Sequence, residues 1–170
     1  MTHSLLLRAS AAALLIASAP LAPDAEAQGV IRHPLPNSDF PILSAAEIPP
    51  GATVVFLSGA VPPVSDASAP PRTVQAYGDT RTQTVSTLTR IQATLQGLRL
   101  TTGDVFKMTV FLVGDPARGG QMDFDGFMQG YRQFYGTAEQ PKLPTRSVVQ
   151  VAGLANPGWL VEIEVTAVRP

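Results

Sequence analysis

The chain has 170 residues, of which 45% are hydrophobic and 15% are charged, and this is enough for one globular domain with its own core. It contains no cysteine, which excludes a disulfide framework and a thiolate metal site. After residue 27 the basic and acidic side chains balance, whereas proteins that bind nucleic acids carry a basic excess that contacts phosphates. We therefore expect no nucleic-acid partner.

The first 27 residues predict a secretory signal peptide. Arg8 precedes a run of small and apolar residues from 9 to 22, and Ala25-Glu26-Ala27 places alanines at the two positions that signal peptidase reads. The alternative is a transmembrane anchor, but the apolar run is short for a span and is rich in alanine. We expect cleavage before Gln28, a periplasmic or secreted mature protein, and no stable membrane anchor.

Residues 28–37 form a predicted N-terminal arm, and residues 38–170 a single domain. Pro34, Pro36 and the absence of a hydrophobic period indicate an arm that is either loose or ordered on contact. His33 is the only histidine after the signal peptide, and a lone histidine in a terminal arm is typically a solvated side chain. Without a second histidine or a cysteine, we expect no metal site.

The domain alternates between strand and helix patterns. Residues 40–48 and 53–59 predict strands, and the apolar run 53–57 favours a central place in a sheet. Residues 79–96 have a helical period with Leu88 and Leu95 on the buried face and Gln83 and Thr87 largely off it. The remaining predicted elements are a strand over 105–112, a helix that Asp123 caps and Gly136 ends, and strands over 144–151 and 159–168.

This order of elements predicts an α+β domain with a single mixed sheet and two helices on one face. Strand alternation places polar side chains on the other face. A polar face that no helix covers favours self-association. The side chains expected on this face are Glu162, Glu164, Thr166, Lys107 and Thr109.

The only chemically plausible pair is Arg146, at the mouth of one C-terminal strand, and Glu162 in the other. If residues 152–158 return the chain antiparallel, the guanidinium and the carboxylate can approach each other. The alternative is a buried ion pair that fixes strand register or a subunit interface.

The chain resembles the Rid family of imine deaminases, also called the YjgF family, from about residue 40 to residue 169. The resemblance implies a fold like bacterial chorismate mutase and a homotrimer with three sites in clefts between subunits. The segments that carry it are Ser58-Gly59-Ala60-Val61-Pro62, Gln83 with Leu88, residues 103–112, Pro144-Thr145-Arg146-Ser147 and residues 161–168.

The resemblance also implies roles for individual residues. Arg146 would hold the carboxylate of an imine or enamine derived from an amino acid, because its planar fork suits that group. Glu162 would position the water or the nitrogen, so that hydrolysis gives a 2-keto acid and ammonia. Ser58 matches the serine at the end of the early strand, and Val148 a pocket wall. Positioning and charge suffice for this reaction, and no cofactor is expected.

The chain departs from the family at three positions. Ile42 stands where active members have tyrosine, Met128 where they often have asparagine, and Val148 where many have cysteine. Ile42 and Met128 make the cleft more apolar, which predicts either a bulkier imino acid or a site that binds without turnover. The alternative function is therefore a non-catalytic trimeric protein that binds small carboxylates or interacts with a partner. A ribonuclease, an activity attached to some relatives, is disfavoured by the neutral charge and the absence of paired histidines.

Overall fold

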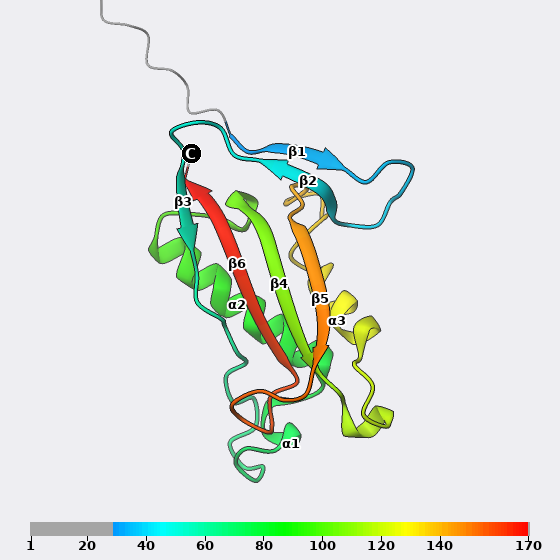
Figure 1. Ribbon diagram of the computed structural model, residues 1–170. Coiled ribbons are helices and arrows are strands. Elements are labelled where there is room, and N and C mark those ends of the chain that lie inside the picture. Colours follow the sequence, from blue (N-terminus) through cyan, green and yellow to red (C-terminus); the bar gives the residue numbers. More distant parts are fainter. Residues whose placement is uncertain (1–28, 170) are drawn as a thin grey trace, which may run out of the picture.

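A computed structural model of the chain describes residues 29–169 and shows a sheet with helices against one face (Figure 1). The four-stranded sheet has the order β3-β6-β4-β5, in which β4 and β5 run parallel and the other neighbours antiparallel. The α+β class, the mixed sheet and the two covering helices are confirmed. The strands are β3 (Thr53–Phe56), β4 (Val105–Val113), β5 (Thr145–Val151) and β6 (Val161–Arg169), and the covering helices are α2 (Thr80–Gly97) and α3 (Phe124–Tyr131).

The predicted signal peptide, residues 1–27, lies outside the described residues. Among the helices that the structure does describe, none combines the length and the apolar character that crossing a membrane requires.

The described residues also form three short helical segments: α1 (Val74–Tyr77), η1 (Thr102–Asp104) and η2 (Pro116–Arg118).

The N-terminal arm contains a strand, β1 (Ile31–Pro34), which pairs antiparallel with β2 (Leu43–Glu47) in a separate two-stranded sheet. The strand predicted over residues 40–48 is therefore shorter and pairs with the arm, not with the four-stranded sheet. The Arg32 guanidinium holds this hairpin in place, donating to the carbonyl oxygens of Val105 at 3.0 Å, Gly103 at 2.9 Å and Leu143.

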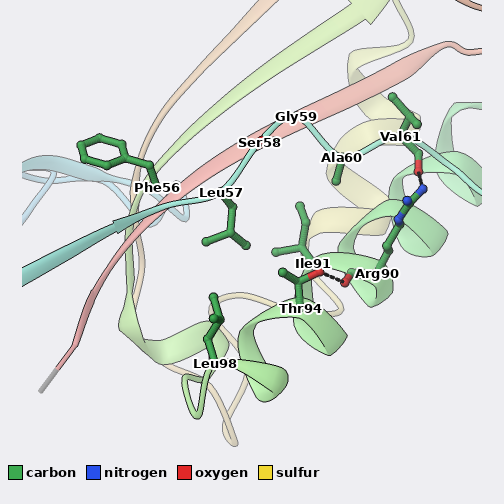
Figure 2. A pocket seen from close by; sticks show the side chains of 10 residues that line it. All are labelled: Phe56, Leu57, Ser58, Gly59, Ala60, Val61, Arg90, Ile91, Thr94 and Leu98. Atoms are coloured by element: carbon green, nitrogen blue, oxygen red, sulfur yellow. Dashed lines mark hydrogen bonds between the residues drawn. The ribbon is translucent and has the colours of Figure 1, made fainter.

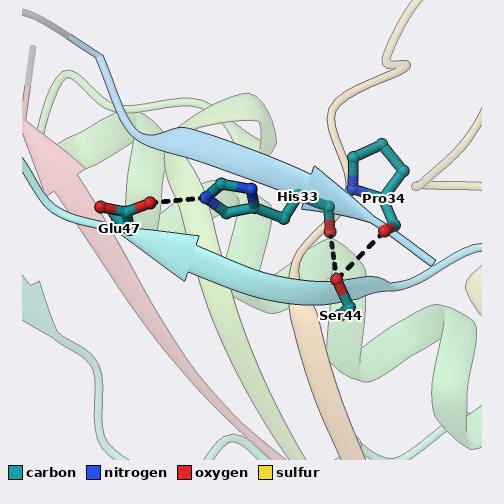
Figure 3. Close-up of polar contacts among 4 residues, drawn as sticks. All are labelled: His33, Pro34, Ser44 and Glu47. Atoms are coloured by element: carbon teal, nitrogen blue, oxygen red, sulfur yellow. Dashed lines mark hydrogen bonds and ion pairs between the residues drawn. The ribbon is translucent and has the colours of Figure 1, made fainter. Parts of the chain in front are cut away.

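His33 lies on the outer side of this hairpin, as predicted for a solvated side chain, with 46% of the side chain exposed. Figure 3 shows its Nε2 facing Glu47 Oε1, 2.6 Å away, and the Ser44 hydroxyl donating to the carbonyls of His33 and Pro34. These contacts stay within the hairpin, so they stabilise it locally.

Helix α2 buries more polar side chains than its pattern predicts. Asp79 caps it by accepting a hydrogen bond from the Thr82 N–H at 2.8 Å. Gln83 and Thr87 are fully buried, so their predicted position off the core face is wrong. Gln83 donates to the Gly158 carbonyl at 3.0 Å and accepts from the Leu160 N–H at 2.7 Å, and these bonds offset the cost of burying its amide.

The core lies between the helices and the sheet. Helix α3 ends at Tyr131, earlier than predicted, but Tyr135 still stacks on Tyr131 with ring centroids 5.0 Å apart. Strand β3 is an edge strand, not the predicted central one, and Phe56 at its end is 79% exposed. The largest buried side chains are Tyr131, Tyr135, Phe127, Leu88, Ile91, Leu95, Leu100, Met108, Leu112, Leu160 and Ile163.

Candidate functional site

The two C-terminal strands that carry Arg146 and Glu162 are not neighbours. Strand β4 lies between them, pairing Met108 with Arg146 on one side and Phe111 with Glu162 on the other. Strands lie about 4.8 Å apart and rise about 3.3 Å per residue, so the two Cα atoms are roughly 14 Å apart. The expected antiparallel pairing is therefore wrong, because α3 lies between β4 and β5 in the chain and such a crossover returns β5 parallel to β4.

The two side chains also point to opposite faces of the sheet. Arg146 lies beside Met108, which is buried under the helices, whereas Glu162 shares the open face with Lys107 and Thr109. The open face itself is as predicted. Within one chain Arg146 and Glu162 do not meet, so the candidate site divides into two separate parts.

The first half, which we call the arginine half-site, is formed by Arg146, Phe40, Phe127, Met128 and Tyr131. The Arg146 guanidinium carbon lies 4.2 Å from the ring centroid of Tyr131, 5.1 Å from that of Phe127 and 5.5 Å from that of Phe40. Its Nη2 donates to Met128 Sδ at 3.2 Å. Aromatic faces stabilise a cation without neutralising it, so the positive charge remains available.

Among residues 29–169 no carboxylate forms an ion pair with Arg146, and its buried Nη1 has no hydrogen-bond partner. Burial lowers the pKa of the guanidinium from its ordinary value, although Tyr131 opposes that shift. Burial also raises the pKa of Tyr131 to about 12, so its hydroxyl stays protonated and donates to the Pro41 carbonyl at 2.9 Å. An unpartnered donor on a half-buried cation favours the arrival of an anion.

Three other predicted positions lie around this half-site. Met128 touches the guanidinium directly. Val148 follows Arg146 by two residues on β5, opposite Val110, and therefore shares the helix-covered face. Ile42 is half-buried at the start of β2, next to Pro41, whose carbonyl Tyr131 binds. The sequence reasoning missed Phe40, although an aromatic residue immediately before the Pro41-Ile42 pair was a usable signal.

The second half, which we call the carboxylate half-site, is formed by Ser58, Gly59 and Glu162. A Cβ atom added at Gly59 would lie 2.0 Å from Glu162 Oε1, so the carboxylate rests directly on the glycine backbone. Phe56 pairs with Thr166 and Ala60 with Ile163, which leaves one extra residue on the Ser58-Gly59 side. Such a bulge redirects side chains at a sheet edge.

The Ser58-Gly59 segment also borders a cavity of about 360 Å³ against α2 (Figure 2). Leu57, Ile91 and Leu98 point into this cavity, and Arg90, which also lines it, donates to the Val61 carbonyl at 3.4 Å. Ser58 and Gly59 line this cavity, whereas Glu162, on the inner strand β6, is not among its lining residues. Within the described part of the chain no group of three acidic or histidine side chains is arranged to hold a metal ion.

The fold and these half-sites define an α+β protein with an arginine on the covered face of its sheet that has no ion-pair partner among the described residues, and a carboxylate on the open face. The family described as Endoribonuclease L-PSP matches residues 48–169 of the chain. The chain belongs to this family, which is the Rid, or YjgF/RidA, family identified above from its motifs.

Named relatives agree with this assignment. The Escherichia coli K12 protein named "Putative reactive intermediate deaminase TdcF" is 35% identical over 117 residues, which are 69% of this chain and 80% of the relative. The crystal structure of Escherichia coli TdcF with bound serine is 33% identical, with a TM-score of 0.53, and covers 72% of this chain and 85% of TdcF. The Escherichia coli YjgF gene product is 29% identical, with a TM-score of 0.52 and the same coverages of 72% and 85%.

Proposed function

We propose that the chain is a Rid-type deaminase that hydrolyses imines derived from amino acids to 2-keto acids and ammonia. The observation that carries the proposal is the Arg146 guanidinium, which is half-buried over Tyr131 and has no acidic partner among the described residues. A substrate carboxylate can bind it without displacing an internal counterion. The serine bound to the relative TdcF carries such a carboxylate, which supports this ligand class.

In the proposed reaction the substrate carboxylate binds Arg146, which fixes the neighbouring imine carbon. Water adds to that carbon while Glu162 accepts one of its protons, and the C=N bond becomes a C–N single bond. The nitrogen then takes up two protons, one returned by Glu162 and one from solvent, the C–N bond breaks, and ammonia leaves with the electron pair of that bond. Loss of the hydroxyl proton leaves the 2-keto acid. Orientation of the substrate and the charges of Arg146 and Glu162 account for the acceleration of imine hydrolysis, and the proposal includes no cofactor.

We further propose that the protein is a homotrimer in which the arginine half-site of one subunit meets the carboxylate half-site of the next. The placement of the two halves on opposite faces supports this arrangement, because a single chain keeps Arg146 and Glu162 roughly 14 Å apart. The open face carries Phe56, which is 79% exposed and would be covered on association.

The activity is tested by letting D-amino-acid oxidase generate an imine from a D-amino acid in the presence of semicarbazide, which traps the imine as a semicarbazone that is followed by its ultraviolet absorbance. The imine carbon is planar, so the configuration of the amino acid does not matter. An active deaminase consumes the imine first and lowers the rate of adduct formation in proportion to its concentration. An unchanged rate with alanine-, leucine- and methionine-derived imines contradicts the proposal.

The assembly is tested by mixing two inactive variants, Arg146→Ala and Glu162→Gln, and letting their subunits exchange. If each site takes Arg146 from one subunit and Glu162 from the next, a mixed trimer contains one intact site. Random mixing of equal amounts should restore about a quarter of the wild-type activity. If both residues come from one subunit, no mixture recovers activity. A monomer in gel filtration would also contradict the trimer.

We also propose that the protein is exported and acts in the periplasm or outside the cell, as the first 27 residues predict. Mass spectrometry of the protein from fractionated cells should show a chain that begins at Gln28.

The competing function is a trimer that binds small carboxylates without turnover, for which the apolar Ile42 and Met128 are the supporting observation. Calorimetric binding of a 2-keto acid by a protein that leaves imine decay unchanged would favour it. A ribonuclease is not favoured, because His33, the one histidine after residue 27, lies on the outer hairpin.

A further inference from the structure

Met128 places a sulfur atom against the Arg146 guanidinium. Its Sδ accepts a hydrogen bond from Arg146 Nη2 at 3.2 Å, and a thioether is a weak acceptor. Nη1 of the same guanidinium is buried and has no hydrogen-bond partner among residues 29–169. A stronger acceptor carried by this side chain would therefore satisfy donors that the thioether leaves weakly bonded or unbonded.

Met128 also lines a second cavity, of about 400 Å³, on the surface of α3. The exposed side chains Asp125, Gln129 and Arg132 line the same cavity, so it opens to solvent, whereas Arg146 is not among its lining residues. A molecule of liquid water occupies about 30 Å³, so a cavity of this size admits a molecule as small as hydrogen peroxide. Only 7% of Met128 is exposed, but the cavity gives a small oxidant access to it.

The other two methionines of the described chain differ from Met128. Met108 is 1% exposed beneath the helices, and Met122 is half-buried just before α3. Among residues 29–169, Met128 is the only methionine whose sulfur forms a hydrogen bond. Oxidation of Met128 would therefore change a contact of a charged group, and Met122 offers a comparison without such a contact.

We propose that Met128 is an oxidation site, and that its sulfoxide binds the Arg146 guanidinium and competes with carboxylate ligands. A sulfur lone pair attacks one oxygen of hydrogen peroxide, the O–O bond breaks, and an S=O bond forms. The sulfur is oxidised by two electrons, and the other oxygen leaves as water with both protons of the peroxide. The inference rests on the proposed function in one respect, which is that Arg146 binds a carboxylate.

The competition follows from the chemistry of the sulfoxide. Its oxygen lies one bond beyond Sδ, and rotation of the unbranched side chain brings that oxygen within reach of the guanidinium donors. Hydrogen bonds to a charged donor are stronger than those between neutral groups, so displacing the oxygen costs a carboxylate about tenfold or more in affinity. The sulfoxide is neutral and leaves the reacting groups in place. Oxidation should therefore raise KM and leave kcat close to its original value.

The first test treats the purified protein with hydrogen peroxide and maps the oxidised methionines by mass spectrometry of peptides. Calorimetry then measures pyruvate binding before and after treatment. We expect a sulfoxide at Met128, an unmodified Met108, and a Kd for pyruvate that rises about tenfold. Methionine sulfoxide reductases of both epimer specificities, with dithiothreitol, should restore the original Kd. Pyruvate binding that is indifferent to a sulfoxide at Met128 overturns the inference, as does a Met128 that stays reduced while Met122 is fully oxidised.

Three variants separate this effect from general oxidative damage. Met128→Leu has no oxidisable sulfur, so its Kd for pyruvate should be the same before and after peroxide. Met128→Gln carries its carbonyl oxygen as many bonds from Cα as the sulfoxide oxygen, so it should bind pyruvate weakly without any peroxide. Met122→Leu is the matched control and should retain the full response of the wild type. A Met128→Leu protein that still loses affinity on oxidation contradicts the proposal.

The imine assay keeps this inference separate from the proposed catalysis. If no imine is hydrolysed, but oxidation weakens pyruvate binding reversibly, the deaminase proposal fails and the oxidation site stands. If imine hydrolysis is intact and its KM does not respond to a sulfoxide at Met128, the inference fails and the deaminase proposal stands. A wild type that binds pyruvate no better than Arg146→Ala overturns the inference, because the guanidinium then has no carboxylate to lose.

Discussion

The two half-sites differ in how the fold holds their charged groups. Arg146 lies among aromatic rings on the covered face, with three ring centroids within 5.5 Å of the guanidinium carbon. Glu162 lies half-buried on the open face, and its carboxylate rests on the backbone of Gly59. Packing against the aromatic rings fixes the guanidinium of Arg146. The carboxylate of Glu162 occupies its position because Gly59 has no Cβ atom there. The two halves should therefore respond differently to substitution.

The largest effect is expected at Arg146. Arg146→Ala should lower kcat/KM by about a hundredfold or more, since the variant has neither the charge nor the forked donor for the substrate carboxylate. Arg146→Lys keeps the positive charge but not the forked donor, so its kcat/KM should lie between those of the wild type and Arg146→Ala. The measurement is the oxidase-coupled imine assay, with the exposed Arg81→Ala as the control. Full activity in Arg146→Ala would remove Arg146 from the site.

A smaller effect is expected at Gly59. Gly59→Ala adds a methyl group where Glu162 Oε1 now lies, and the end of that flexible side chain can move aside. We therefore expect a folded protein with thermal stability close to that of the wild type but with kcat lowered about tenfold, because the carboxylate is displaced from the water. Gly153→Ala, at an exposed glycine with open space around it, is the matched control. Unchanged kcat in Gly59→Ala would show that the position of Glu162 is not critical.

The smallest effect, on stability alone, is expected at Asp79, outside both half-sites. Asp79→Ala removes the cap of α2 and should lower the free energy of unfolding by about 1 kcal/mol in urea denaturation at pH 7. Hydrogen bonds from Thr82 lower the pKa of Asp79, so its ionised form is stabilised by folding. This contribution is complete above the ordinary aspartate pKa and is lost as the pH falls through the lowered one. Asp79→Asn should retain most of the cap but not its pH dependence.

Elements with strong local signals were predictable from the sequence. Asp123 caps α3 as expected, and the alternation of β6 places Glu162 on the open face. The strand patterns of residues 144–151 and 159–168 indicate Arg146 and Glu162, and the family motifs imply their roles. The local patterns that identify the charged residues therefore also predict the face of the sheet on which Glu162 lies.

Strand pairing and buried polar groups were not predictable, because both depend on residues far apart in the chain. The short connection after β5 indicated a hairpin, but β5 pairs parallel with β4 and leaves β6 on the other side. Gln83 reads as a surface residue until its partners at Gly158 and Leu160, more than 70 positions away, are known. For the same reason the sequence placed Arg146 and Glu162 together, although they lie on opposite faces.

The hydrogen bonds of Arg32 have a practical consequence for anyone who shortens this protein. They fasten the N-terminal hairpin to the segments that lead into β4 and β5, and Phe40 occupies the loop of that hairpin. A truncated version starting beyond residue 34 would lack these hydrogen bonds, and the Phe40 ring would no longer be held against the guanidinium of Arg146. Recombinant forms intended for ligand studies should therefore retain β1 with its Arg32.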